Sequence, residues 1–240
     1  MILERTEHPD WLSNAYLVAE GEGGNGVLID GNGVAQPLLD RIERDRIVIT
    51  DVLCTHSHQD HVDGIKELAR RFGVPVRAHP LAAGSLGAEP MSDRQAIHSG
   101  YLEIRALETP GHCSDHLAFV VGEDDCFTAD VLFKGTVGGT GSGSFQELRE
   151  SIMDRLMRLE PETRVHPGHR EPTTIGREWE SNPFVRVWRG IDEELSEPCK
   201  VRGEDATLVL WAPDYDGGHK AWVRYPDGRE AIVGGSQVER

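Results

Sequence analysis

The first half of the chain alternates short apolar runs with segments in which apolar residues recur at helical spacing. Leu38, Leu39 and Ile42 fall on one side of a predicted helix, and the mostly apolar run at 47–54 is typical of a buried strand. The glycine-rich segment 21–26 suits a flexible turn between two strands. In this half we predict strands at 15–19, 27–29 and 47–54 and helices at 36–42 and 62–72.

The second half begins with strand patterns joined by short turns and continues with one longer helical pattern. In the predicted helix at 145–159, Leu148, Ile152 and Leu156 fall on one apolar face. The glycine-rich segment 135–143 is predicted to be a flexible loop. The predicted strands here are 101–107, 117–121 and 126–129. Strands that alternate with helices indicate an α/β fold with mixed sheets.

From residue 199 onward the pattern changes to short β-like runs separated by strong turn signals. These runs, at 208–211, 220–225 and 231–233, predict a small antiparallel meander. Three strands of this size are marginally stable alone. We therefore predict one domain at 1–198 and a C-terminal extension at 199–240 that packs on that domain or on a second subunit.

Composition narrows the classes of partner. The 240 residues include 41 acidic and 25 basic side chains, a net charge of −16 that repels phosphate backbones and anionic lipids. We therefore expect no nucleic-acid or membrane partner. Glu4 and Arg5 stand where a signal peptide would have its apolar segment, so we expect a cytoplasmic location. The four cysteines form no Cys-x-x-Cys pair, which argues against a disulfide scaffold.

The histidines carry the chemical signal. His56, His58, Asp60 and His61 crowd into six positions directly after a predicted buried strand. Residues two apart leave a strand on the same side, so His56 and His58 can reach one ion. Asp60 and His61 lie at the turn into the next helix, where they can address a second ion. Neutral imidazole and carboxylate are zinc ligands, so the sequence predicts a metal site here.

This run resembles the His-x-His-x-Asp-His motif of the metallo-β-lactamase-fold hydrolases. Further motifs of that family follow in order: Thr109-Pro110-Gly111-His112, then Asp130, then Pro167-Gly168-His169. The resemblance implies an αββα sandwich, two mixed sheets flanked by helices. It also implies a dinuclear site with the following ligands: His56, His58 and His112 on the first metal, Asp60, His61 and His169 on the second, and Asp130 bridging both.

Within the family, the chain looks most similar to the glyoxalase II-like (hydroxyacylglutathione hydrolase-like) branch. The resemblance implies two divalent metal ions, zinc first with iron or manganese as alternatives, and a shared hydroxide that attacks a thioester or related ester. Asp60 would orient that water and accept its proton. Lys134 is a candidate contact for an anionic group of the substrate.

Two features depart from that branch. Relatives that bind glutathione often carry Gly-Arg where this chain has Gly138-Gly139, and the meander replaces their helical C-terminal domain. The family also usually has Gly where this chain has Ala129. A mononuclear-iron persulfide dioxygenase-like enzyme, a lactonase of the same fold and a binding module without turnover stay open. We expect a small-molecule substrate, and a homodimer also stays open.

Overall fold

The computed structural model describes residues 1–240 and divides by its internal contacts into two compact units. The first unit comprises Met1–Glu108, Asp115–Ala129 and Gly168–Arg170. The second unit comprises Thr109–Ser114, Asp130–Pro167 and Glu171–Arg240. The chain therefore passes several times between the units, and segments far apart in sequence build each one.

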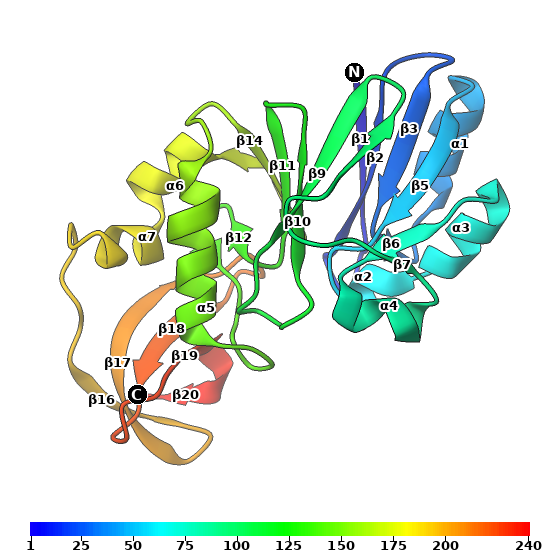
Figure 1. The fold of residues 1–240 in the computed structure, drawn as a ribbon. Helices are drawn as coiled ribbons and strands as arrows, with labels where there is room; N and C mark the ends of the chain where they lie inside the picture. The colour runs from blue at the N-terminus through cyan, green and yellow to red at the C-terminus, as the bar shows by residue number, and fades with distance from the viewer. The chain divides into compact units, whose positions relative to one another are not determined.

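The first unit contains a mixed sheet in the strand order β1-β2-β3-β5-β6-β7 (Figure 1). Its first three strands are antiparallel and the remaining pairs are parallel. The strands are β1 (Ile2–Glu7), β2 (Asn14–Ala19), β3 (Asn25–Ile29), β5 (Val48–Leu53), β6 (Val76–Ala78) and β7 (Glu89–Pro90). Strands predicted at 15–19, 27–29 and 47–54 are thus confirmed.

Helices cover one face of this sheet because alternate strand residues are apolar on that side. Leu17 of β2 joins the core cluster that also holds Leu38 and Leu68 from the helices. The helices of this unit are α1 (Gln36–Arg44), α2 (Gln59–Val62), α3 (Ile65–Phe72) and α4 (Pro80–Leu86). The helix predicted at 62–72 is α3, which begins at Ile65; Val62 ends α2, and the two helices part at Asp63 and Gly64, where Gly64 has a φ of +79°.

The opposite face of the sheet packs on four antiparallel strands, β8 (Ala96–Ser99), β9 (Leu102–Glu108), β10 (Leu117–Val121) and β11 (Asp125–Ala129). Tyr16 and Val18, the β2 residues that alternate with Leu17, share a core cluster with Phe119 and Phe127. Both faces of β2 are therefore buried, in keeping with the apolar run that follows Asn14 in its sequence. The predicted fold class, mixed α/β with sheets and helices, is confirmed.

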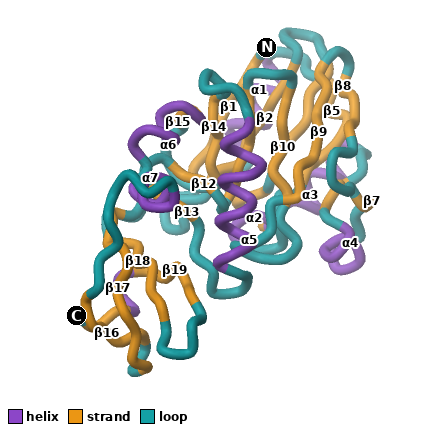
Figure 2. The backbone as a smooth tube through the Cα atoms, turned by 60° about the vertical axis from the view of Figure 1, so that its left-hand side comes forward, coloured by secondary structure: helices purple, strands orange, loops and turns teal.

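The second unit begins with short paired strands and helices (Figure 2). These elements are β12 (Leu132–Phe133), β13 (Thr136–Val137), α5 (Phe145–Glu150), β14 (Arg164–Pro167), β15 (Thr173–Thr174), α6 (Ile175–Ser181) and α7 (Pro183–Trp188). The helix predicted at 145–159 is α-helical only as far as Glu150, and then continues as a π-helical turn and a short 3-10 turn ending at Arg158. Hydrophobic spacing alone does not separate these helix types, because Leu148, Ile152 and Leu156, one from each segment, are all completely buried.

The C-terminal sheet has five antiparallel strands in the order β19-β18-β17-β16-β20. They are β16 (Glu197–Val201), β17 (Glu204–Pro213), β18 (His219–Arg224), β19 (Glu230–Gly234) and β20 (Val238–Glu239). The three predicted strands are present, and β16 and β20 join them. No helix of the structure combines the length and the apolar composition needed to cross a membrane.

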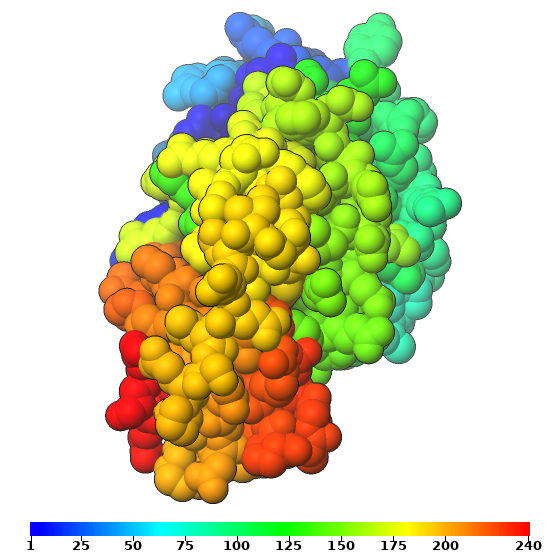
Figure 3. All heavy atoms as spheres, turned by 90° about the vertical axis from the view of Figure 1, so that its left-hand side faces the viewer, coloured from blue at the N-terminus to red at the C-terminus, as the bar shows by residue number.

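This sheet packs within its own unit. Ala221 and Val223 of β18 point into a small core between the C-terminal strands. Trp222, on the other side of β18, stacks on the Phe145 ring with the centroids 5.0 Å apart. In Figure 3 the orange and red spheres of the sheet lie directly against the yellow and green spheres of the same unit. The C-terminal sheet therefore packs against α5 through the Trp222 ring.

Candidate metal centre

The histidine motif follows β5 in the first unit, where the strand turns into α2. His56 and His61 are almost completely buried. The His56 ring centroid lies 4.7 Å from that of His58 and 4.4 Å from that of His61. His58 has extended backbone dihedrals and precedes the first residue of α2, so the chain reverses between it and His61. This reversal brings three imidazoles from six consecutive positions together.

His169 joins this group from a distant part of the sequence. Its position is set by the start of β2, since Ser13 forms an isolated bridge with His169 and the Asn14 backbone N–H donates to the Gly168 carbonyl at 2.6 Å. The buried Asn14 side chain also donates to the Arg170 carbonyl. Ser13 and Asn14 are thus the residues that hold the Pro-Gly-His segment against the first sheet.

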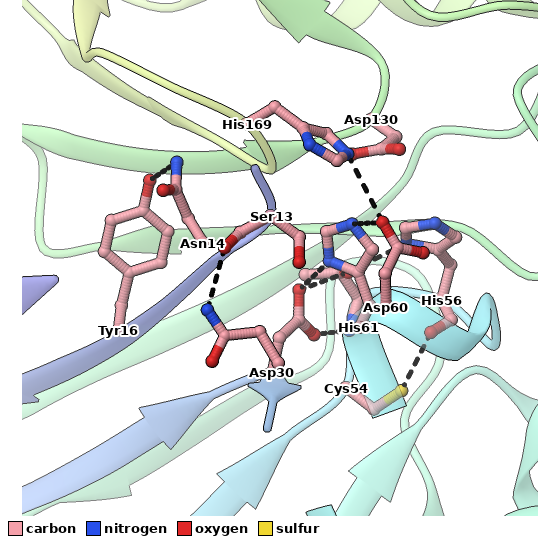
Figure 4. Close-up of polar contacts among 12 residues, drawn as sticks. Ser13, Asn14, Tyr16, Asp30, Cys54, His56, Asp60, His61, Asp130 and His169 are labelled. Carbon is pink, nitrogen blue, oxygen red and sulfur yellow. Dashed lines mark hydrogen bonds and ion pairs between the residues drawn. The ribbon is translucent and has the colours of Figure 1, made fainter. Parts of the chain in front are cut away.

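Asp60, His61 and His169 have the geometry of ligands to one cation (Figure 4). Asp60 Oδ2 lies 3.6 Å from His61 Nε2 and 3.5 Å from His169 Nε2. One donor atom from each residue lies within 4.8 Å of the others. Ligand atoms arranged tetrahedrally around zinc at its usual bond lengths are about 3.3 Å apart. The donor set and its spacing therefore fit a divalent cation such as zinc.

Asp30 holds His61 in place, and the sequence analysis missed it. Its Oδ2 lies 2.9 Å from His61 Nδ1 and accepts a hydrogen bond from the Thr55 hydroxyl at 2.8 Å, while its Oδ1 accepts from the Thr55 backbone N–H at 2.8 Å. A carboxylate only accepts, so His61 Nδ1 carries the proton and Nε2 offers its lone pair to the cluster. The sequence feature that could have pointed to Asp30 is its place directly after the apolar run 27–29 and before Gly31.

The remaining predicted ligands, His112 and Asp130, lie in the second unit. His112 Nε2 is 3.7 Å from Asp130 Oδ2, and His112 Nδ1 is 2.8 Å from the Gly139 carbonyl oxygen. Ala129, which precedes Asp130, has a φ of +39°. This left-handed conformation favours glycine, which accounts for the glycine expected from the family pattern at the position where this chain has alanine.

Lys134, the predicted substrate contact, lies outside these two groups. Lys134 is exposed in the turn between β12 and β13. His116 is fully buried, with its ring centroid 5.1 Å from that of His56. The segment 135–143 differs from the predicted flexible loop, because Thr136 and Val137 form β13 and Thr140 is buried.

Comparison with known proteins identifies the family. The model of the metallo-beta-lactamase superfamily matches residues 8–169, which include every predicted ligand. The chain belongs to the metallo-β-lactamase superfamily. This family and the homologues of the chain are mostly metal-dependent hydrolases.

Three relatives illustrate the similarity. Hydroxyacylglutathione hydrolase GloC of Haemophilus influenzae is 32% identical over 196 residues, with 72% of this chain and 92% of that protein covered. ETHE1 from Myxococcus xanthus has a TM-score of 0.72 at 27% identity, covering 78% of this chain and 85% of its own. TTHA1623, solved in a di-iron-bound form, has a TM-score of 0.63 at 33% identity, covering 75% and 99% respectively.

Proposed function

We propose that this protein is a dinuclear metal-dependent hydrolase that cleaves the thioester of a hydroxyacid with glutathione or a similar thiol. The observation that carries the proposal is the cluster of Asp60, His61 and His169, with Asp30 setting the proton on His61. A buried carboxylate that accepts a hydrogen bond from a ligand imidazole orients that imidazole and raises its basicity. The contact between Asp30 and His61 therefore supports a metal-binding role for the cluster.

The proposed ligand assignment follows the family motif. His56, His58 and His112 would hold one metal, Asp60, His61 and His169 the other, and Asp130 both. His112 supports this role by its tautomer, because the Gly139 carbonyl can only accept a hydrogen bond and therefore leaves the proton on Nδ1. Zinc is the first choice for this set of nitrogen and oxygen donors, and iron or manganese also suits it.

The bound ions would supply a nucleophilic hydroxide near neutral pH and a Lewis acid for the acyl oxygen. Side chains of the protein would orient the water, accept its proton and position the metal ligands. Asp60, whose side chain keeps 25% of its surface accessible, would orient the water and take its proton through a carboxylate oxygen. Asp30, which is buried, would hold the His61 ring through the reaction.

The substrate class rests on the similarity to hydroxyacylglutathione hydrolase over most of that protein's length. The identity of the thiol carrier depends on the residues at Gly138 and Gly139. A Cβ at Gly138 would lie 1.9 Å from the Asp130 carbonyl oxygen, and one at Gly139 would contact the Ile232 carbonyl oxygen of β19 at 3.5 Å. The C-terminal sheet thus borders the position at which glutathione-binding relatives often carry arginine. Lys134 is our candidate for the anionic end of the substrate.

The test is thioester hydrolysis by the zinc-reconstituted protein. It is measured as the release of thiol from a hydroxyacyl-glutathione and, separately, from an acyl-coenzyme A thioester. We expect turnover to fall about 10²–10⁴-fold in Asp60→Asn, because the water loses its proton acceptor. The control is His98→Ala, which removes an exposed histidine of β8. Absence of thiol release from both substrates by a fully metal-loaded protein would refute the thioesterase proposal.

The second candidate, a mononuclear-iron persulfide dioxygenase-like enzyme, is favoured by the structural similarity to ETHE1 from Myxococcus xanthus. It predicts one iron per chain and oxygen uptake on addition of glutathione persulfide. Lactone hydrolysis is a third outcome and belongs in the same substrate panel. An oxygen electrode and a lactone assay on the same preparations separate these reactions from thioester cleavage.

A further inference from the structure

The segment 138–140 connects a predicted metal ligand to the C-terminal sheet, through hydrogen bonds to residues of the second unit. Its first residue is fixed on Asp130. The Gly138 N–H donates to the Val131 carbonyl at 3.1 Å, and Gly138 packs so closely on the Asp130 carbonyl that no side chain fits. The segment therefore has little freedom at this end.

The middle of the segment holds His112. The Gly139 carbonyl oxygen accepts from His112 Nδ1 at 2.8 Å, which directs His112 Nε2 toward Asp130 Oδ2. The Ser142 hydroxyl donates to the His112 carbonyl at 3.0 Å. The direction of the Gly139 carbonyl thus decides both the tautomer and the orientation of the imidazole.

The far end of the segment is attached to β19, the edge strand of the C-terminal sheet. The Thr140 N–H donates to the Ile232 carbonyl at 2.9 Å, and the Ile232 N–H donates to the Thr140 hydroxyl at 2.9 Å. Thr140 is buried and Ile232 is completely buried. The first bond fixes the peptide plane that follows Gly139, because the Thr140 N–H lies in that plane, and the second holds the Thr140 side chain on the same residue of β19. β19 therefore sets the direction of the carbonyl that His112 uses.

We propose that Thr140 is a positioning residue for the metal ligand His112, and that the C-terminal sheet is a structural part of the metal centre through its bond to Thr140. The family match ends at residue 169, so this sheet lies outside the part of the chain that the family explains. The inference rests on the proposed metal-binding function, which supplies the role of His112.

The experiment measures the two zinc dissociation constants of the full-length protein by competition with a chromophoric chelator. Thr140→Val replaces the hydroxyl by a methyl group of similar volume and removes the acceptor of the Ile232 N–H. We expect one zinc site to weaken about tenfold, the lower end of the effect seen when outer partners of a ligand are removed. Thr140→Ser keeps the hydroxyl, and we expect its zinc affinity to match that of the wild type.

Thr207→Val is the matched control, because Thr207 lies in β17 of the same sheet and pairs with Arg224 and Pro198 rather than with the segment 138–140. The cobalt-substituted proteins add a second readout, since displacement of His112 changes the visible absorption of one cobalt ion. Should Thr140→Val fail to fold, Thr140→Ala removes the same acceptor without inserting an apolar group, and the same tenfold loss is expected of it.

Equal zinc affinities and equal cobalt spectra in the wild type and the Thr140 variants would overturn the positioning role. An equal loss in Thr207→Val would also overturn it, because the effect would then come from the stability of the sheet. Failure of the wild type to bind metal at all would instead refute the proposed function, so the two failures are distinguishable.

Discussion

Replacing Asp30 by asparagine tests how the protein sets the proton on His61. The wild-type carboxylate accepts three hydrogen bonds, from the Thr55 backbone, the Thr55 hydroxyl and His61 Nδ1. The asparagine side chain would offer one acceptor and one donor group in their place. If its oxygen faces the Thr55 N–H, its amide group faces His61 Nδ1 and favours the tautomer with the proton on Nε2. If it is turned around, two donors meet at the Thr55 backbone.

The magnitude follows from these two orientations. In the first, His61 loses the lone pair that a cation requires, and the loss of an outer partner weakens metal binding about 10–100-fold, or about 1.4–2.7 kcal/mol. In the second orientation, the Thr55 backbone N–H loses its hydrogen bond to a charged group at a position, residue 30, that is only 3% exposed. This loss costs about 1.5–3 kcal/mol of folding free energy. Asp30→Asn therefore weakens zinc binding, destabilises the metal-free protein, or does both.

The assay is a chelator competition for zinc together with urea unfolding of the metal-free protein. The control is Asp51→Asn, because Asp51 is a buried aspartate of β5 whose partner is Arg77 at 2.6 Å. We expect Asp51→Asn to reduce stability and leave both zinc constants unchanged. The reasoning fails if Asp30→Asn has the zinc affinities and the unfolding free energy of the wild type.

Three further predictions concern single residues. Trp222→Ala empties the space between the C-terminal sheet and α5, so we expect the free energy of unfolding in urea to fall by about 3–5 kcal/mol, and a loss below about 1 kcal/mol would contradict that packing. Two backbone N–H groups, of Tyr101 and Asn25, donate to Glu20 and lower its pKa below 4.5. Its contribution to stability is therefore present above pH 4.5 and lost as the pH falls through the folded-state pKa, so the urea midpoints of Glu20→Gln and the wild type should differ at pH 7 and converge once the pH falls below that pKa; a difference that does not change with pH would contradict the prediction. Burial raises the pKa of Cys126 to about 12, so mass-spectrometric mapping should find this thiol unalkylated at pH 8 in the native protein and alkylated in urea, whereas rapid native alkylation would show that the thiol is accessible.

Local sequence patterns predicted the elements whose signals are contained in a few consecutive residues. Leu17 alternates with Tyr16 and Val18 and so marks a strand buried on both faces, and the His56 to His61 run marks a site on its own. The strands β16 and β20 were missed because β16 contains proline and lysine and β20 has only two residues. β16 forms a hairpin with β17, and β20 pairs with β16 from 39 positions away (Lys200 with Glu239), a non-local contact that no short pattern records.

The supporting residues of the site could not be predicted for the same reason. Asp30 contacts a histidine 31 positions away, and Thr140 contacts a strand residue 92 positions away. Neither spacing carries a periodic signal. The expectation of a flexible loop at 135–143 did not anticipate the short strand β13 or the close packing of two glycines: Gly138 lies against the Asp130 carbonyl and Gly143 against the Gly111 carbonyl.

The most direct test of the dinuclear centre is the metal content of the purified protein, measured by mass spectrometry beside His169→Ala and the control His98→Ala. We predict two divalent ions per chain in the wild type and in the control, and close to one in His169→Ala, because Asp60 and His61 lose their third partner. One iron per chain that persists in His169→Ala would contradict the dinuclear assignment and favour the oxygen-consuming reaction.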